Sequence, residues 1–158
     1  MSEKSTGEDE IQVELIGEET ESRFGSKTEH KRKPLQPQIE TVTPNNWSKY
    51  FPDKTLTPDD RREIEAGLWY LRVAIDPQND AMAGFVEVRR LHDNALYVDV
   101  SGEYQRRGVA TTLIRQAQAD HNSLQLLNYA GLAGKNLYTK MGFKHEGGLD
   151  HFVWRKTE

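Results

Sequence analysis

Three segments between residues 68 and 100 alternate apolar and polar side chains, and only short turn clusters separate them. Alternation with a period of two is typical of strands that bury one face. The clusters at 76–80 and 92–94 are too short for a crossover helix, so consecutive strands must run antiparallel. The pattern therefore predicts a three-stranded antiparallel meander, with strands at 68–75, 81–91 and 95–100.

Helical spacing replaces alternation after residue 100. Apolar residues recur on one face from Val109 to Ala117 and predict a helix from Gly108 to about His121. The apolar segment 124–127 follows this crossover, so we expect it to lie parallel to the strand at 95–100. The remaining predicted elements are an amphipathic helix at 130–141 that Gly142 ends, and a hairpin of 143–146 and 151–154 around Gly147 and Gly148.

The region before the meander carries two threonine–proline signals for the start of a helix. After a short strand at 39–42, Thr43 is predicted to cap a first helix whose inner face is aromatic. Thr57 is predicted to cap a second, surface helix that ends near Ala66 and lies across the substrate opening. The aromatic residues of the first helix are Trp47, Tyr50 and Phe51.

Residues 1–38 differ in composition from the remainder. Eight acidic residues and one lysine lie in 1–21, whereas five basic residues and one glutamate lie in 22–33. Because residues 1–38 contain too few apolar side chains to form a core, we expect them to be a disordered charged tail. One domain, at 39–158, would follow this tail. Residues 11–15 alternate and are a candidate short strand or docking segment. The cluster at 30–33 is a candidate nucleic-acid contact, but a solvated linker is favoured because the acidic half screens it.

Composition excludes several classes of protein. The net charge of −4 argues against a generic polyanion binder. The absence of cysteine excludes disulfides, thiolate metal sites and a cysteine nucleophile. No apolar run approaches the ~18 residues of a membrane-spanning helix. Because the first residues also lack a hydrophobic signal region, we expect a soluble, cytoplasmic protein with no membrane partner.

The segment from Tyr104 to Ala110 joins the strand at 95–100 to the helix that begins near Gly108. Such a turn gathers unpaired backbone N–H groups at the positive end of a helix. Arg106 and Arg107 add positive charge beside them. This combination predicts a site for a phosphorylated ligand.

Two motifs carry a family resemblance. The segment from Val98 to Ala110, with Gln105, Gly108 and Ala110 in the pattern Gln/Arg-x-x-Gly-x-Gly/Ala, resembles the acetyl-CoA-binding motif of the GNAT N-acetyltransferase superfamily. Residues 136–143 resemble its second signature, a Leu-Tyr pair before Lys-x-Gly-Phe. Their order and spacing match the family over about residues 39–155. The resemblance implies an α/β (α+β) GNAT fold, whose mixed, mostly antiparallel central sheet is splayed at the acetyl-CoA site and has helices on both faces.

The resemblance also implies how acetyl-CoA, the co-substrate, would be bound, and it implies no metal. A bulge in the strand at 95–100 would splay it from its parallel neighbour. The pantetheine arm would then pair with backbone along Val98, Asp99 and Val100, where an N–H near Val100 would polarise the thioester carbonyl. The pyrophosphate would lie on backbone and arginine groups of the turn. These groups belong to Arg106, Arg107, Gly108, Val109, Ala110 and Thr111.

Tyr138 matches the family position that often protonates the departing CoA thiolate, although a core tyrosine that packs between helix and sheet is the alternative. Asp99 is the first candidate for the general base that takes a proton from the acceptor ammonium. The other candidates are Glu87, Glu103, Asp93, His92 and a chain of water molecules.

The chain departs from the family pattern before Tyr138. Gly131 stands where the family often has an asparagine that contacts the cofactor, and the nearby Asn128 is not equivalent. The second glycine of the turn is Ala110, a mild change.

These residues predict an acetyl-CoA-dependent N-acetyltransferase that transfers an acetyl group to a primary amine by direct attack, without an acyl-enzyme. The acceptor, a small molecule or a protein, is not specified by any motif. The alternative is a GNAT-fold protein that binds or modifies a protein or nucleic-acid partner without acetyl transfer. A homodimer is a further expectation, with 151–154 as a pairing edge strand.

Overall fold

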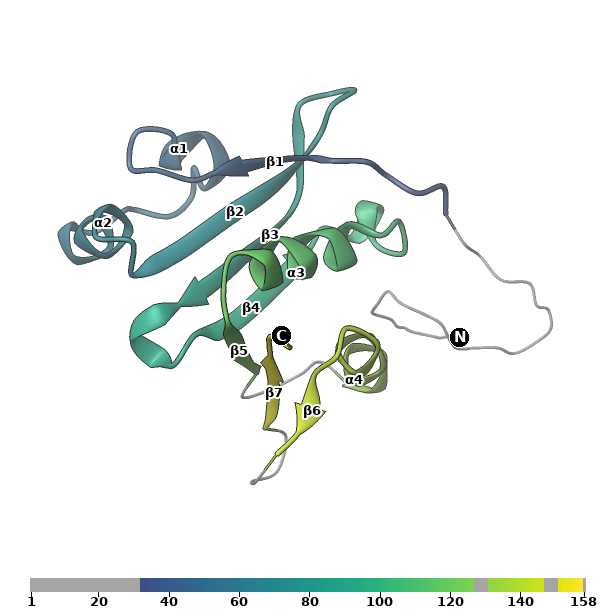
Figure 1. Cartoon of the computed structure of the whole chain (residues 1–158). Coiled ribbons are helices and arrows are strands. Elements are labelled where there is room, and N and C mark those ends of the chain that lie inside the picture. Colours follow the sequence, from purple (N-terminus) through teal and green to yellow (C-terminus); the bar gives the residue numbers. More distant parts are fainter. Residues whose placement is uncertain (1–31, 127–130, 147–150, 158) are drawn as a thin grey trace.

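The computed structural model describes residues 32–126, 131–146 and 151–157 (Figure 1). The expectations for residues 11–15, Leu127, Asn128, Ala130, Gly147 and Gly148 therefore lie outside the described residues. In the described part the strands are β1 (Gln38–Thr41), β2 (Trp69–Asp76), β3 (Ala81–Arg89), β4 (Ala95–Val100), β5 (Ser123–Leu126), β6 (Lys144–His145) and β7 (Phe152–Arg155). The helices are α1 (Trp47–Tyr50), α2 (Pro58–Glu65), α3 (Val109–Ala119) and α4 (Gly131–Lys140), with short 3₁₀ turns at Arg90–His92 and Gly102–Tyr104.

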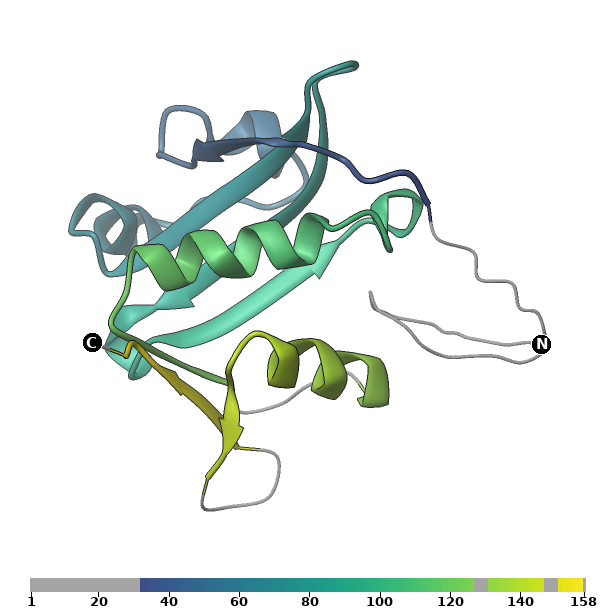
Figure 2. The ribbon, with the colours of Figure 1, turned by 45° about the vertical axis from the view of Figure 1, so that its right-hand side comes forward.

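The strands form one sheet in the order β1-β2-β3-β4-β5-β7-β6. The strands β1 to β4 are antiparallel neighbours, which confirms the predicted meander. The crossover through α3 makes β5 parallel to β4, as predicted, and β7 returns antiparallel to β5. Helix α3 covers one face of the sheet and α1 and α2 cover the other (Figures 1 and 2). The predicted fold class, a mixed and mostly antiparallel sheet with helices on both faces, is confirmed.

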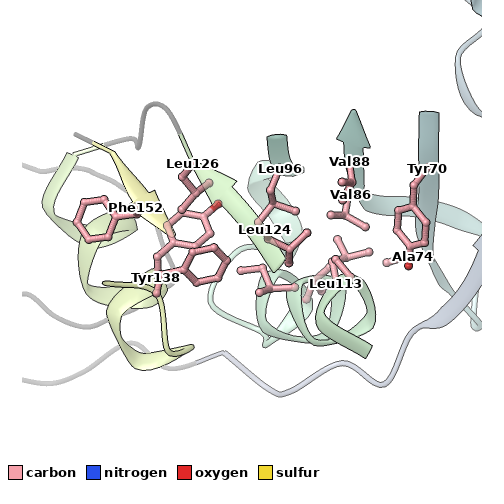
Figure 3. Packing of buried hydrophobic residues seen from close by; sticks show 14 of the residues in the cluster. Tyr70, Ala74, Val86, Val88, Leu96, Leu113, Leu124, Leu126, Tyr138 and Phe152 are labelled. Carbon is pink, nitrogen blue, oxygen red and sulfur yellow. The ribbon is translucent and has the colours of Figure 1, made fainter. Parts of the chain in front are cut away.

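Two hydrophobic clusters pack on opposite faces of the sheet. One joins α3 and α4 to the sheet through residues such as Leu113, Leu124 and Tyr138 (Figure 3). The other packs the aromatic residues of α1 against β2. Strand β2 serves both clusters, because its alternate residues face opposite sides. The face predicted for it, made of Trp69, Leu71, Val73 and Ile75, is confirmed.

Helix α1 begins later than predicted. The prediction that Thr43 caps this helix is wrong, because the helix begins at Trp47 and Asn46 precedes it. The Asn46 side chain accepts the Thr43 N–H at 2.7 Å and donates to the Thr41 carbonyl at 3.1 Å, which folds the intervening residues into a turn. The predicted inner face is nevertheless confirmed, since Trp47, Tyr50 and Phe51 are all buried.

Helix α2 begins where its threonine–proline signal predicted. The Thr57 hydroxyl accepts the Asp60 N–H at 3.1 Å, Pro58 occupies the first helical position, and Asp59 and Asp60 complement the positive helix end. No side chain of α2 is buried, so the prediction of a surface helix is confirmed. Its position across a substrate opening stays a prediction.

The last strand lies inside the sheet. We expected residues 151–154 to form an edge strand, and this is wrong, because β7 pairs with β5 on one side and with β6 on the other. The physical reason is that β6, although only two residues long, pairs with Phe152 and Val153 on the outer side of β7. The homodimer itself stays a prediction.

Candidate functional site

The turn between β4 and α3 has the geometry of an anion site. Gly108 precedes the helix with φ +85°, and Arg106 also lies in the left-handed region, with φ +64°. The first helical hydrogen bond is donated by the Thr112 N–H to the Gly108 carbonyl at 3.1 Å. Within the described part of the chain, the N–H groups of residues 108–111 donate to no protein acceptor. They converge at a helix N-terminus, where an anion is stabilised.

Gly108 is required for its backbone conformation. A Cβ built on Gly108 would meet no atom within 4 Å, so crowding by the protein does not demand glycine. Its φ of +85° does demand it, because a residue with a side chain rarely adopts this value. The sequence argument, that glycine lets a ligand approach the turn closely, is compatible with this open space.

The turn is braced on its inner side. Tyr104 is buried, and its hydroxyl donates to Asp76 Oδ2 at 3.0 Å while accepting from Asn79 Nδ2 at 3.3 Å. Gln105 Nε2 donates to the Val100 carbonyl at 3.2 Å. These contacts tie the turn to the β2–β3 hairpin and to the end of β4. Sequence reasoning missed Tyr104 and Asp76, because their partnership joins positions 28 residues apart.

Residues 32–35, within the predicted tail, pack along the same turn. Arg32 Nη1 donates to the Gly102 carbonyl at 2.9 Å and to the Gln105 carbonyl at 3.4 Å. The Leu35 N–H donates to the Arg107 carbonyl at 2.9 Å, and Arg107 Nε donates to the Lys33 carbonyl at 2.9 Å. The Arg107 guanidinium, which we expected to contact the pyrophosphate, thus contacts the N-terminal segment. The sequence carried no signal for this contact beyond the basic cluster.

Strands β4 and β5 separate beside this turn. In the described residues they pair at Ala95 and Gln125, and no further pair follows along β4. Figures 1 and 2 show the described strands β4 and β5 running apart, which agrees with the predicted splay. The predicted bulge is not observed in the pairing of β4 with β3, because all six pairs from Gly84–Val100 to Arg89–Ala95 are in register. Residues 127–130, which follow β5, lie outside the described residues.

The edge of β4 that is turned away from β3 carries the backbone N–H groups of Val98 and Val100. The Ser101 N–H donates to the Ala83 carbonyl of β3 at 2.9 Å. Since N–H groups alternate in direction along a strand, Asp99 also addresses β3, whereas Val98 and Val100 address the gap. An extended ligand arm laid along this edge would meet the backbone N–H groups of Val98 and Val100 and not that of Asp99; that such an arm binds here stays a prediction.

Gly84 permits this arrangement. A Cβ at Gly84 would lie 2.6 Å from the Asp99 carbonyl oxygen and 3.1 Å from Val100 Cα. These are backbone atoms, so any larger residue would push β4 away from β3. Sequence reasoning missed Gly84. A glycine within a strand indicates that another group approaches closely, but the sequence does not identify that group.

Tyr138 points from α4 into the first cluster, toward the sheet (Figure 3). Its ring packs edge-on against Phe143, with centroids 5.4 Å apart. Burial raises the pKa of the Tyr138 hydroxyl, and the nearby Tyr97 of β4 raises it further. The group is therefore protonated throughout the neutral range, but it holds its proton more tightly than a free tyrosine does. The alternative of a core tyrosine agrees with the same packing.

Asp99 is exposed on the face of β4 opposite α3. It pairs across the strands with Phe85, whose ring lies 6.0 Å from that of Tyr97. Burial raises the pKa of the Tyr97 hydroxyl, and the carboxylates of Asp99 and Glu87 add to the shift. Glu87 accepts the Trp69 indole N–H at 3.0 Å. This acidic and aromatic face adjoins the gap and is separate from the turn.

The other candidate bases lie at different distances from the gap. Glu103 is exposed within the 3₁₀ turn after β4. His92 and Asp93 precede β4, at the end remote from the anion site. A six-residue strand is about 20 Å long, so these two residues are not placed to act at the Val100 end.

No helix of the described residues is long and apolar enough to cross a membrane. Among the same residues, no three histidine or acidic side chains come together as metal ligands.

A helix N-terminus beside the edge of β4 is an arrangement that suits an extended, phosphorylated ligand. The family model for the acetyltransferase (GNAT) domain matches residues 65–145. The chain therefore belongs to the GNAT acetyltransferase family, as the two motifs predicted. No curated protein matches it.

Solved structures share the fold. The PaiA N-acetyltransferase from Thermoplasma acidophilum, in complex with coenzyme A, is 13% identical over 77% of this chain and 100% of its own, with a TM-score of 0.55. A GNAT-family acetyltransferase from Staphylococcus aureus is 14% identical over 76% of this chain and 99% of its own, with a TM-score of 0.53. The IAA acetyltransferase from Bacillus cereus is 16% identical over 77% and 100%, with a TM-score of 0.50.

Proposed function

We propose that this protein is an acetyl-CoA-dependent N-acetyltransferase that acetylates a primary amine by direct attack. The observation that carries the proposal is the start of α3, where the N–H groups of residues 108–111 have no acceptor among the described residues, next to the edge of β4 that has no partner there beyond its single pair with β5. A phosphorylated end and an extended arm, the two recognition elements of acetyl-CoA, fit these two features. The coenzyme A complex of the Thermoplasma relative supports the same donor.

In this proposal the backbone binds the donor. The N–H groups of residues 106–111 and the charge of Arg106 hold the pyrophosphate. The edge groups of Val98 pair with the pantetheine arm, and the Val100 N–H, whose own carbonyl accepts from Gln105, polarises the thioester carbonyl. Acetyl-CoA, when bound, supplies the activated acetyl group. Arg107 contributes to this site through its backbone and by holding the N-terminal segment.

Two side chains move protons. Tyr138 donates its hydroxyl proton to the leaving thiolate; the hydroxyl is protonated at neutral pH, as this role requires, although burial raises its pKa and so makes it a weaker acid than a free tyrosine. Asp99 accepts, directly or through water, the proton that the ammonium must lose before its nitrogen attacks the acetyl group. Asp99 and Tyr97 lie on the face opposite α3, so the acceptor approaches from the side of α1 and α2.

Calorimetric titration with acetyl-CoA tests the donor. We expect binding in the micromolar range, as is typical of enzyme substrates. The absence of binding at about 1 mM would overturn the proposal. Thiol release with a panel of small amines and lysine peptides then tests transfer. Tight acetyl-CoA binding without turnover on either kind of amine would favour the alternative of a GNAT-fold binding protein.

A further inference from the structure

The segment of residues 32–35 contacts the anion-binding turn through four hydrogen bonds, two from the Arg32 side chain and two that involve Arg107. Leu35 also packs against the first hydrophobic cluster, which anchors the segment next to the turn. A segment in this place would either cover the N–H groups that receive the phosphates or support them from behind. Peptide geometry decides between the two.

The carbonyl and the N–H of a trans peptide point in opposite directions. The Arg107 carbonyl points at the Leu35 N–H, so the N–H of Gly108 points away from the segment. The Gln105 carbonyl points at Arg32, so the N–H of Arg106 also points away. The segment therefore lies behind the turn, on the side opposite the phosphate-binding N–H groups.

Arg106 and Gly108, whose N–H groups point away from the segment, both lie in the left-handed region. Their φ values are +64° and +85°. For Arg106, which carries a side chain, this conformation is unfavourable, so neighbouring contacts must hold it. Arg32 binds the carbonyls on both sides of Tyr104, at Gly102 and Gln105. It is thus placed to hold the chain that leads into the strained residue.

We propose that residues 32–35 form a buttress that fixes the turn in its anion-binding conformation, with Arg32 as the positioning residue. The N-terminal segment then sets the affinity for acetyl-CoA although its side chains do not touch the phosphates. This inference rests on the proposed function, because it concerns the site of the same donor. It also gives Arg107 a defined role, since its side chain holds the Lys33 carbonyl and its carbonyl receives the Leu35 N–H.

The test compares Arg32→Ala with Lys33→Ala in the full chain. Both variants remove one positive charge from adjacent positions, but Lys33 contributes only its backbone carbonyl to the buttress. We expect Arg32→Ala to raise the Kd for coenzyme A about fivefold, because two hydrogen bonds from a charged but exposed donor are lost. We expect Lys33→Ala to leave the Kd within about twofold, since only a screened charge is lost.

Kinetics separate positioning from catalysis and from folding. Arg32→Ala should raise KM for acetyl-CoA without changing kcat or KM for the amine, and Arg32→Lys should restore part of the affinity. If Arg32→Ala and Lys33→Ala raise the Kd for coenzyme A equally, the segment acts only through its charge. That result would overturn the buttress. Unchanged affinity in Arg32→Ala, with a wild type that binds, would overturn the inference alone. A wild type that does not bind coenzyme A would overturn the proposed function as well.

Discussion

The two sides of the open end of β4 are built from different parts of the chain. The proposed donor side consists of backbone, namely the edge groups of Val98 and Val100 and the N–H groups of residues 108–111. The proposed acceptor side consists of side chains, namely Phe85, Tyr97 and Asp99. A backbone site needs only correct dihedral angles, whereas a side-chain site changes with every substitution. The donor is therefore inferred from the fold, and the acceptor is not.

The largest effect that would test this comparison is expected from Gly108→Val. A β-branched residue at φ +85° costs about 1–3 kcal/mol, so the turn should abandon its conformation and acetyl-CoA binding should fall beyond calorimetric detection. Gly102→Ala is the matched control in the same turn, because a Cβ there meets no atom within 4 Å and φ is not positive. A Gly108→Val variant that binds normally would show that the backbone does not form the donor side.

Gly84→Ala should have the next largest effect. The new Cβ would lie 2.6 Å from the Asp99 carbonyl oxygen, so β4 must move at the point where the gap opens. We expect a loss of about 1–3 kcal/mol in the free energy of unfolding, measured by urea titration, together with weaker acetyl-CoA binding. Unchanged stability would mean that β3 and β4 are not in the close contact described.

Tyr138→Phe separates chemistry from binding. Loss of the proton donor should lower kcat by about 10²-fold, while the Kd for acetyl-CoA stays constant. Tyr70→Phe is a suitable control, since it removes a hydroxyl that donates to Asp120 at 2.5 Å in another part of the molecule. It should lower stability without lowering kcat. Full activity of Tyr138→Phe would leave this residue as a core tyrosine only.

Asp99→Asn should lower kcat by roughly tenfold and weaken its dependence on pH, because the base that accepts the ammonium proton is lost. Acetyl-CoA binding should not change, since the Asp99 backbone addresses β3 and not the gap. A pH–rate profile identical to the wild-type profile would assign deprotonation to water or to another residue.

The smallest expected effect concerns stability and pH at His121, far from both sides of the site. Burial lowers the pKa of this imidazole, and the positive charges of Arg90 and Arg72 lower it further, against the opposing carbonyl of Ala117 and the carboxylate of Asp120. Because the folded pKa is below the unfolded value of about 6.5, the unfolded state binds the proton first. Stability should therefore be complete above that pH and fall as the pH decreases through the folded pKa. Urea titrations of His121→Gln should show a flatter dependence below pH 6.5.

The limits of sequence reasoning follow the same division. The meander, the Thr57 cap and Gly142 were predictable, because alternation, capping and a positive φ leave local signals. The position of β7 between β5 and β6 was not, because pairing among strands of two to four residues is decided by distant partners. The contact of Arg32 with the turn was equally invisible, since it joins residues 70 positions apart. Within the candidate site, the glycine turn was predictable and its buttress was not.

Amide hydrogen exchange with and without coenzyme A would show whether the donor binds to the backbone of β4 and α3. We expect slower exchange on binding at Val98 and Val100, whose N–H groups face away from β3, and at residues 108–111. The Asp99 N–H, which already addresses β3, should change little. If coenzyme A binds but the exchange rates at Val98, Val100 and residues 108–111 do not change, the donor site is not made of the backbone of β4 and α3.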